Sequence, residues 1–146
     1  MPTALVTGGC GFIASNFINR MKDKYPDIVF VTVDKMDYCS NPKNIHEGKA
    51  IIVKGNVGNA ELIEHLIHDY KFDYVFHFAA QSHVDNSFEN SLTFTRDNVY
   101  GTHVLIEACR HHLPNVEFIH FSTDEVYGES VTDVPFNESE TVLKPT

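Results

Sequence analysis

The sequence predicts an α/β fold in which helices cover both faces of a doubly wound parallel sheet. Short β-branched runs alternate with stretches of helical period, and a turn rich in glycine follows the first run. The run at residues 28–33 is β-branched almost throughout, as in a parallel strand that is buried on both faces. Strands that alternate with helices are typical of a parallel sheet between two layers of helices.

Five strands and three helices are expected along the chain. The strands are predicted at 3–7, 28–33, 50–53, 74–78 and 116–121, and the helices from Ile13 to about residue 24, from an Asn59 cap to Tyr70, and over 91–112. The apolar side of the last helix is expected to hold Phe94, Val99, Leu105, Ile106 and Cys109. A polar loop is expected over 35–49, and loop again from Ser122 onward.

The order of these elements predicts a Rossmann-type fold with the strand order 3-2-1-4-5. Crossovers between parallel strands are right-handed, and two mononucleotide-binding halves diverge from the first strand. The ligand crevice of such a sheet lies beyond the carboxyl ends of strands one and four. The glycine turn, the stretch after Phe78 and the stretch after Phe121 all open onto that edge.

Length and composition limit the function classes. A chain of 146 residues predicts one domain, residues 1–146. The net charge of −9 and the lack of a basic cluster argue against nucleic-acid binding, and no apolar stretch reaches membrane-spanning length. Three widely spaced cysteines and the lack of a signal-peptide pattern predict reduced thiols and a cytoplasmic location.

The glycine turn predicts a phosphate site. Gly8, Gly9 and Gly11 stand where the first strand turns into the first helix, and Ala14 is small enough for that helix to pack on its strand. Gly11 has no Cβ, so a pyrophosphate can approach the backbone at the positive end of the helix. The pattern fits the dinucleotide fingerprint with Ala in its third place, although glycine clusters also make ordinary turns.

Asp34 ends the second strand, 20 residues after Ala14. A carboxylate there can accept both ribose hydroxyls of the adenosine half and repels a 2′-phosphate, which predicts NAD rather than NADP. The alternative is an Asp that only begins a turn. Lys35, the next residue, weakens the preference for NAD because it is a cation at the same place.

Two further stretches follow strands at the same edge. Ala79 and Ala80 would let a cofactor lie against the backbone, although simple packing explains small residues equally well. Asp124 and Glu125 place two carboxylates where a substrate would lie. Neighbours on a strand point to opposite faces, so both can reach one substrate only if the backbone has left strand geometry by Asp124.

Nine histidines raise the question of a metal site, and none is predicted. His65 and His68 share a helix face and His111 and His112 are adjacent, but neither pair has Cys or a carboxylate at the spacing of a metal site, which favours surface positions. Cys10 lies at a helix N-terminus, where a thiol pKa falls, but the turn around it is explained without a nucleophile, so a packing role is expected.

Five motifs carry a resemblance to a known family. They are Thr7–Ala14, Asp34–Tyr38, His77–Asp85, Asn98–Thr102 and Ser122–Gly128. Together they resemble the extended short-chain dehydrogenases/reductases, and within them the nucleotide-sugar 4,6-dehydratases. Stretches 37–41 and 83–88 look most like the UDP-glucose enzymes of rhamnose synthesis, with the dTDP-glucose enzymes close behind.

The resemblance implies a reaction and its residues. A hydride passes from C4 of the glucosyl unit to NAD, water is eliminated across C5 and C6, and the hydride returns to C6. By this resemblance Asp124 is the acid, Glu125 the base and Thr123 a partner of the sugar, while Ser82 touches substrate and cofactor. The implied NAD site comprises Gly8, Gly11, Phe12, Ile13, Asp34, Lys35, Asn56, Val57, Phe78, Ala79, Ala80, Ser82 and Asp97.

The chain departs from the family pattern in three ways. Asn56 stands where Asp is usual, which keeps an acceptor for adenine, and Asp97 stands where Thr is common, which adds a charge near the cofactor. No tyrosine has a lysine four residues on, so the Tyr-x-x-x-Lys pair that takes the C4 hydroxyl proton is absent. Family members are much longer, so an amino-terminal fragment of a homodimeric enzyme is expected.

Two other functions stay open. The chain could be an NAD-binding module without chemistry, or part of a nucleotide-sugar 4-epimerase. Epimerases share the first motifs of the resemblance but lack the run Thr123-Asp124-Glu125.

Overall fold

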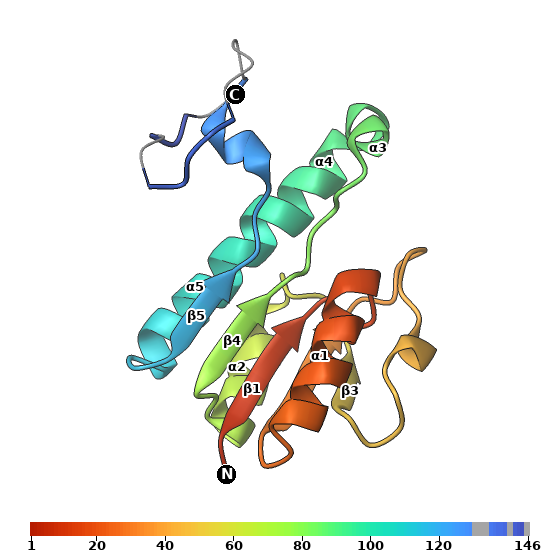
Figure 1. The fold of residues 1–146 in the computed structure, drawn as a ribbon, viewed down its shortest axis with the longest axis vertical. Helices are drawn as coiled ribbons and strands as arrows, with labels where there is room; N and C mark the ends of the chain where they lie inside the picture. The colour runs from red at the N-terminus through yellow and green to blue at the C-terminus, as the bar shows by residue number, and fades with distance from the viewer. Residues whose placement is uncertain (130–134, 140–141, 145–146) are drawn as a thin grey trace.

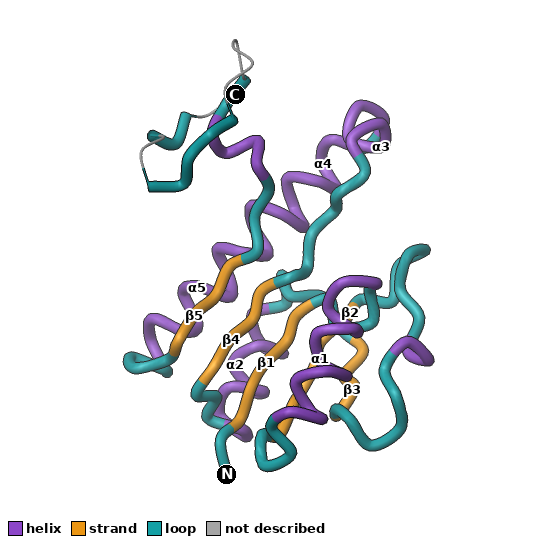
Figure 2. Tube along the Cα trace, in the orientation of Figure 1, coloured by secondary structure: helices purple, strands orange, loops and turns teal. Residues whose placement is uncertain are grey.

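A computed structural model describes residues 1–129, 135–139 and 142–144. Five parallel strands form one sheet in the order β3-β2-β1-β4-β5, which confirms the predicted fold class and strand order (Figures 1 and 2). The strands are β1 Thr3–Thr7, β2 Val29–Asp34, β3 Ile51–Lys54, β4 Tyr74–His77 and β5 Glu117–His120. Their ends match the predicted ones or differ from them by one residue.

Helices cover both faces of the sheet, as Figure 1 shows. Helix α1, Phe12–Lys24, lies on one face, and helices α2, Ala60–Tyr70, and α5, Gly101–His112, lie on the other. Alternate residues of the strands feed the two cores. Ala4 and Val6 of β1 pack in the core under α1, and Leu5 between them packs in the core under α2 and α5.

Helix α2 begins where its cap was predicted. The Asn59 side chain accepts a hydrogen bond from the Leu62 amide at 3.2 Å, and Glu61 lies in the first turn. The helix ends at Tyr70, and the next residue, Lys71, adopts a left-handed conformation with φ 49°. An asparagine cap of this kind stabilises a helix by about 1 kcal/mol.

The predicted helix over 91–112 is helical but not one regular α-helix. It comprises α4, Ser91–Phe94, a π-helical segment Thr95–Tyr100, and α5. Because π-helical turns bond i to i+5, the segment shifts the helix face relative to α-helical spacing. Two residues of the predicted apolar side, Val99 in the π-helical segment and Ile106 in α5, are 65% and 45% exposed, whereas Leu105 and Cys109 are buried as expected.

Three helical segments were not predicted. A 3-10 helix over Pro42–Asn44 lies within the loop expected over 35–49. Helix α3, Val84–Glu89, has six residues, which is too short to show a helical period in the sequence. A 3-10 turn over Asp124–Tyr127 stands in the segment expected to be loop. The sequence Lys144-Pro145-Thr146 resembles the stretch just before the family's tyrosine, and its last two residues lie outside the described part of the chain. No helix among residues 1–129, 135–139 and 142–144 is long and apolar enough to cross a membrane.

A buried histidine joins β1 to the helix behind the sheet. The Thr102 hydroxyl donates to the Asn98 carbonyl at 2.6 Å, so it accepts from His77 Nε2 at 2.8 Å. His77 Nδ1 then accepts a hydrogen bond from the Thr7 hydroxyl at 2.6 Å. The oxygen of that hydroxyl also accepts a hydrogen bond from the Ala79 amide at 3.1 Å. The ring is neutral in this chain of bonds, and burial together with His120 lowers the pKa of His77 to about 4.

This histidine makes stability depend on pH. The unfolded chain takes up the proton at a pKa of about 6.5 and the folded chain only near 4. Acidification from pH 7 to 5 therefore favours the unfolded state, with a loss of about 2 kcal/mol in the free energy of unfolding from this residue. Urea unfolding at both pH values measures this decrease in the free energy of unfolding. The decrease is expected to disappear in His77→Gln and to remain in the exposed control His68→Gln. Equal losses in the two variants would contradict the assignment.

Candidate active site at the carboxyl edge of the sheet

A cleft of about 490 Å³ opens where β1, β2, β4 and β5 end. Its size lies in the range of small-molecule and cofactor sites. Every residue of the predicted NAD site lies along its wall, as does Thr123. The structure thus brings together side chains that are separated by up to about a hundred positions in the sequence.

The glycine turn forms the wall beside β1. Gly8 has φ +69°, and its amide donates to the Val33 carbonyl at 2.8 Å. A Cβ on Gly8 would lie 2.9 Å from Ala79 Cα, so the residue must be glycine for β1 and β4 to meet here. Gly11 is the N-cap of α1, and among the described residues no side chain caps this helix end. Its first amides and the helix dipole therefore favour an anion in the cleft.

Asp34 fixes the wall beside β2. The side chain is buried, with one carboxylate oxygen accepting the Cys10 amide at 3.0 Å and the other the Met36 amide at 2.8 Å. Each oxygen keeps a second lone pair. Cys10 is fully buried, and burial, with Asp34 beside it, raises its pKa to about 11, in agreement with the packing role predicted for this thiol.

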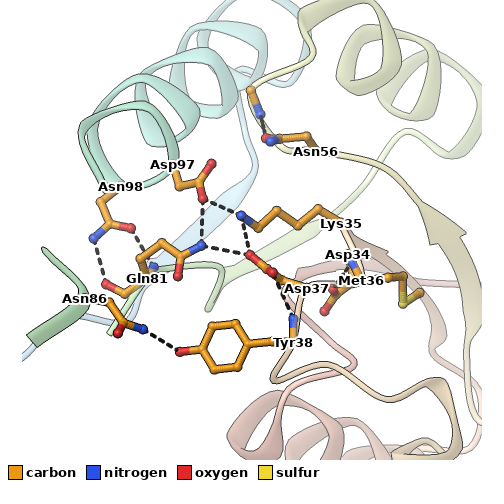
Figure 3. A network of polar contacts seen from close by, with 11 residues as sticks. Asp34, Lys35, Met36, Asp37, Tyr38, Asn56, Gln81, Asn86, Asp97 and Asn98 are labelled. Carbon is orange, nitrogen blue, oxygen red and sulfur yellow. Dashed lines mark hydrogen bonds and ion pairs between the residues drawn. The ribbon is translucent and has the colours of Figure 1, made fainter. Parts of the chain in front are cut away.

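Lys35 is held by two carboxylates, as Figure 3 shows. Its ammonium lies 2.6 Å from Asp97 Oδ2 and 2.7 Å from Asp37 Oδ2. The Gln81 side-chain amide donates to the same two oxygens at 2.9 and 3.1 Å. The Gln81 backbone is tied in turn to the Asn98 side chain at 2.7 and 2.9 Å. The charge that Asp97 adds to the cleft is therefore paired within the protein.

These contacts shift the titration of all three charged groups. The Lys35 ammonium, the Tyr38 amide and Gln81 lower the pKa of Asp37 to about 2. Burial raises the pKa of Asp97, but hydrogen bonds from Lys35 and Gln81 outweigh it and leave that pKa lowered. Burial lowers the pKa of Lys35, and its two carboxylate partners more than reverse this. All three groups are charged at neutral pH.

The remaining wall combines apolar and polar groups. Phe78 and Phe121 stack with ring centroids 3.6 Å apart, beyond the ends of β4 and β5. Ser82 is exposed at the rim. Asn56 was expected to offer its acceptor to adenine, and its oxygen already accepts the Gly58 amide at 2.8 Å.

The run Thr123-Asp124-Glu125 meets the geometric condition set by the sequence. β5 ends at His120, and Asp124 begins a 3-10 turn, so the two carboxylates are not on opposite faces of a strand. Thr123 lines the cleft, whereas Asp124 and Glu125 lie just outside its wall and are exposed. The Thr123 hydroxyl lies 3.5 Å from Glu125 Oε2.

The surface histidines do have carboxylate neighbours, contrary to the sequence-based expectation. His65 Nε2 lies 3.3 Å from Asp69 Oδ2, and His111 Nε2 lies 3.3 Å from Glu107 Oε2. Both carboxylates stand one helical turn from the histidine, a spacing that allows contact. No group of three or more metal-ligating side chains occurs within the described parts of the chain.

Several cleft residues were not predicted. They are Val33, Asp37, Cys39, Ser40, Gly55, Phe121 and Ser122, along with Ala14. Asp37 stands in a motif that the sequence already singled out, three positions after a strand that ends at the crevice. Its position after that strand was the available signal, because parallel strands bring such loops together.

The fold and cleft define a dinucleotide-binding α/β domain. The family model described as GDP-mannose 4,6 dehydratase matches residues 5–146. The chain therefore belongs to this family of nucleotide-sugar dehydratases.

Named relatives share this part of the chain. A trifunctional UDP-glucose 4,6-dehydratase/UDP-4-keto-6-deoxy-D-glucose 3,5-epimerase/UDP-4-keto-L-rhamnose-reductase of Arabidopsis thaliana is 49% identical over 97% of this chain and 22% of its own length. The human dTDP-D-glucose 4,6-dehydratase is 45% identical over 92% of this chain and 39% of its own length. The chain thus spans well under half of these relatives.

Two solved structures resemble this chain over nearly its whole length. The dTDP-glucose 4,6-dehydratase of Bacillus anthracis, in complex with NAD, has a TM-score of 0.85 at 33% identity and covers 100% of this chain and 45% of its own. The UDP-glucose 4-epimerase of Thermotoga maritima, with UDP-glucose, has a TM-score of 0.86 at 28% identity and covers 99% of this chain and 45% of its own. The backbone is therefore common to both activities.

The glycine turn yields a matched pair of substitutions. Gly8 and Gly48 have φ of +69° and +74°, but a Cβ meets Ala79 at Gly8 and open space at Gly48. Gly8→Ala and Gly48→Ala share the cost of the left-handed backbone, and only Gly8→Ala adds overpacking, of about 1–3 kcal/mol. Urea unfolding is expected to show that excess loss. Equal losses would show that β1 and β4 do not need this close approach.

Proposed function

We propose that the chain is the NAD-binding part of a nucleoside-diphosphate-glucose 4,6-dehydratase, which converts UDP-glucose or dTDP-glucose to the 4-keto-6-deoxy sugar nucleotide. The supporting observation is the meeting of the glycine turn and Asp34 with Thr123 on one cleft, and the two carboxylates that follow it. A step in the synthesis of rhamnose or another deoxysugar fits the names of the relatives.

The residues present fit NAD. The open N-terminus of α1 suits the pyrophosphate, and Asp34 can accept the ribose hydroxyls with its second lone pairs. Phe12 and Ile13, 81% and 68% exposed, offer apolar surface at the cleft. When bound, NAD supplies the place where the C4 hydride is held between its removal and its return.

The chemistry proposed for this chain lies at the rim. A C4 ketone acidifies the proton on C5, so Glu125 as a base can remove it while Asp124 as an acid protonates the hydroxyl that leaves C6. Thr123 and Ser82 would hold the sugar by hydrogen bonds from their hydroxyls. The exposure of both carboxylates leaves them accessible to a sugar that enters from solvent.

A 4-epimerase is the second candidate, supported by the matching backbone of the Thermotoga enzyme. Epimerisation at C4 eliminates no water and needs no acid and base pair at C5 and C6. The adjacent carboxylates at Asp124 and Glu125 therefore favour the dehydratase. An NAD-binding module without chemistry leaves this pair without a role.

We also propose that the chain is the amino-terminal part of a longer protein, because it spans 22% and 39% of its curated relatives and lacks Tyr-x-x-x-Lys. The 146 residues alone would then have no acceptor for the C4 hydroxyl proton and turn over little or no substrate. The unpaired state of Cys10, Cys39 and Cys109 supports the cytoplasm as its location.

A homodimer is proposed for the longer protein. Leu92, Val99 and Ile106, which lie along the helical run behind the sheet, are 81%, 65% and 45% exposed, and apolar side chains of this size favour a partner surface. Sedimentation velocity of the longer protein is expected to give twice the monomer mass, and a monomer at micromolar concentration would contradict the proposal.

The longer protein tests the roles of the two carboxylates. Glu125→Gln removes the base and is expected to lower 4-keto-6-deoxy product formation from UDP-glucose or dTDP-glucose at least about 100-fold. The product is measured by mass spectrometry as loss of one water. Glu129→Gln, a neighbouring exposed carboxylate, serves as the control and should retain activity. Unimpaired dehydration in an Asp124→Asn, Glu125→Gln double variant, or C4 epimer as the only product, would contradict the proposal.

A further inference from the structure

We propose that Asp97 sets the selectivity of the cleft for NAD over NADP by occupying the ammonium of Lys35, an inference that rests on the proposed NAD site. Lys35 directly follows Asp34, the residue at the ribose position. In dinucleotide sites a basic side chain at that position accommodates the 2′-phosphate of NADP. Lys35 is such a cation, and it already has other partners.

The donors of Lys35 are largely used. An ammonium has three N–H donors, and two of them face Asp97 at 2.6 Å and Asp37 at 2.7 Å. Gln81 donates to both of these carboxylate oxygens, which fixes them on the two sides of the ammonium (Figure 3). A 2′-phosphate would have to replace these contacts to bind Lys35.

The charges around Lys35 also oppose the 2′-phosphate of NADP. The cleft wall here carries three carboxylates and one ammonium, a formal balance of −2. Asp37 and Asp97 pair with Lys35, and Asp34 lines the same cleft. The Asp97 side chain is only 11% exposed, so solvent ions screen its charge less than that of a surface group. A 2′-phosphate adds a charge of about −1.5 to −2 at neutral pH.

The π-helical segment brings Asp97 into this position. Asp97 is buried on the cleft side of the segment, whereas Val99, two residues on, is 65% exposed. Asp97 is 62 positions from Lys35 in the sequence, and only the fold makes them neighbours. Asp37, by contrast, is a local partner two residues away. Asp97 therefore decides whether Lys35 is held across the cleft or is free to turn to the ribose.

Binding measurements on the longer protein test the inference. Isothermal titration with NAD and with NADP gives the ratio of the two dissociation constants, which cancels any loss common to both cofactors. Asp97→Asn is expected to shift this ratio about tenfold toward NADP, and Asp37→Asn with Asp97→Asn to shift it further. Asp69→Asn, on α2 outside the cleft, changes the net charge equally and should leave the ratio unchanged.

Lys35→Met in the Asp97→Asn background identifies the cause. If the freed ammonium binds the 2′-phosphate, this double variant loses the shift toward NADP that Asp97→Asn alone produces. An unchanged ratio in Asp97→Asn, or a gain that persists without Lys35, would overturn the inference while NAD binding by the wild-type protein still upheld the proposed function. A wild-type protein that binds neither cofactor would overturn the proposed function and the inference with it.

Discussion

The site depends on the bonds that tie the turn after β1 to the end of β2. The Asp34 carboxylate accepts a hydrogen bond from the Cys10 amide. The Gly8 amide donates to the Val33 carbonyl, and the Gly9 amide donates to the Thr32 hydroxyl at 3.1 Å. In a parallel sheet a separate loop follows the carboxyl end of each strand, and the sheet itself does not join these loops. These bonds fix the glycine turn against β2, so that the end of α1 and the Asp34 carboxylate face the same cleft.

A second set of bonds ties the other side of the cleft to the helix behind the sheet. His77 joins Thr7 to Thr102 within the protein interior, and Gln81 joins the loop after β4 to the π-helical segment. A buried, fully paired polar network of this kind is rigid, because breaking one bond leaves an unpaired group away from water. The cleft wall is therefore formed before any ligand arrives.

The sequence predicted what short-range rules and strand order determine. The glycine turn, the Asn59 cap and the strand order 3-2-1-4-5 follow from local backbone chemistry and from right-handed crossovers, and the structure agrees with each. Helix α3 was missed because six residues show no period, and the π-helical segment because apolar spacing does not reveal one extra residue in a turn. The contact of Lys35 with Asp97 depends on tertiary structure, so the sequence showed two charges near the cofactor but not their pairing.

Binding of NAD at the carboxyl edge of the sheet underlies the proposed function. Amide NMR spectra of the protein during an NAD titration test this binding residue by residue. Saturable shifts are expected at Gly8, Gly11, Phe12 and Ile13, with smaller changes around Asp34. A second hollow of about 200 Å³ lies between α2 and α5, lined by Ala60, Tyr100 and His103 among others. Shifts confined to that hollow, or no shifts at all, would contradict NAD binding at the carboxyl edge.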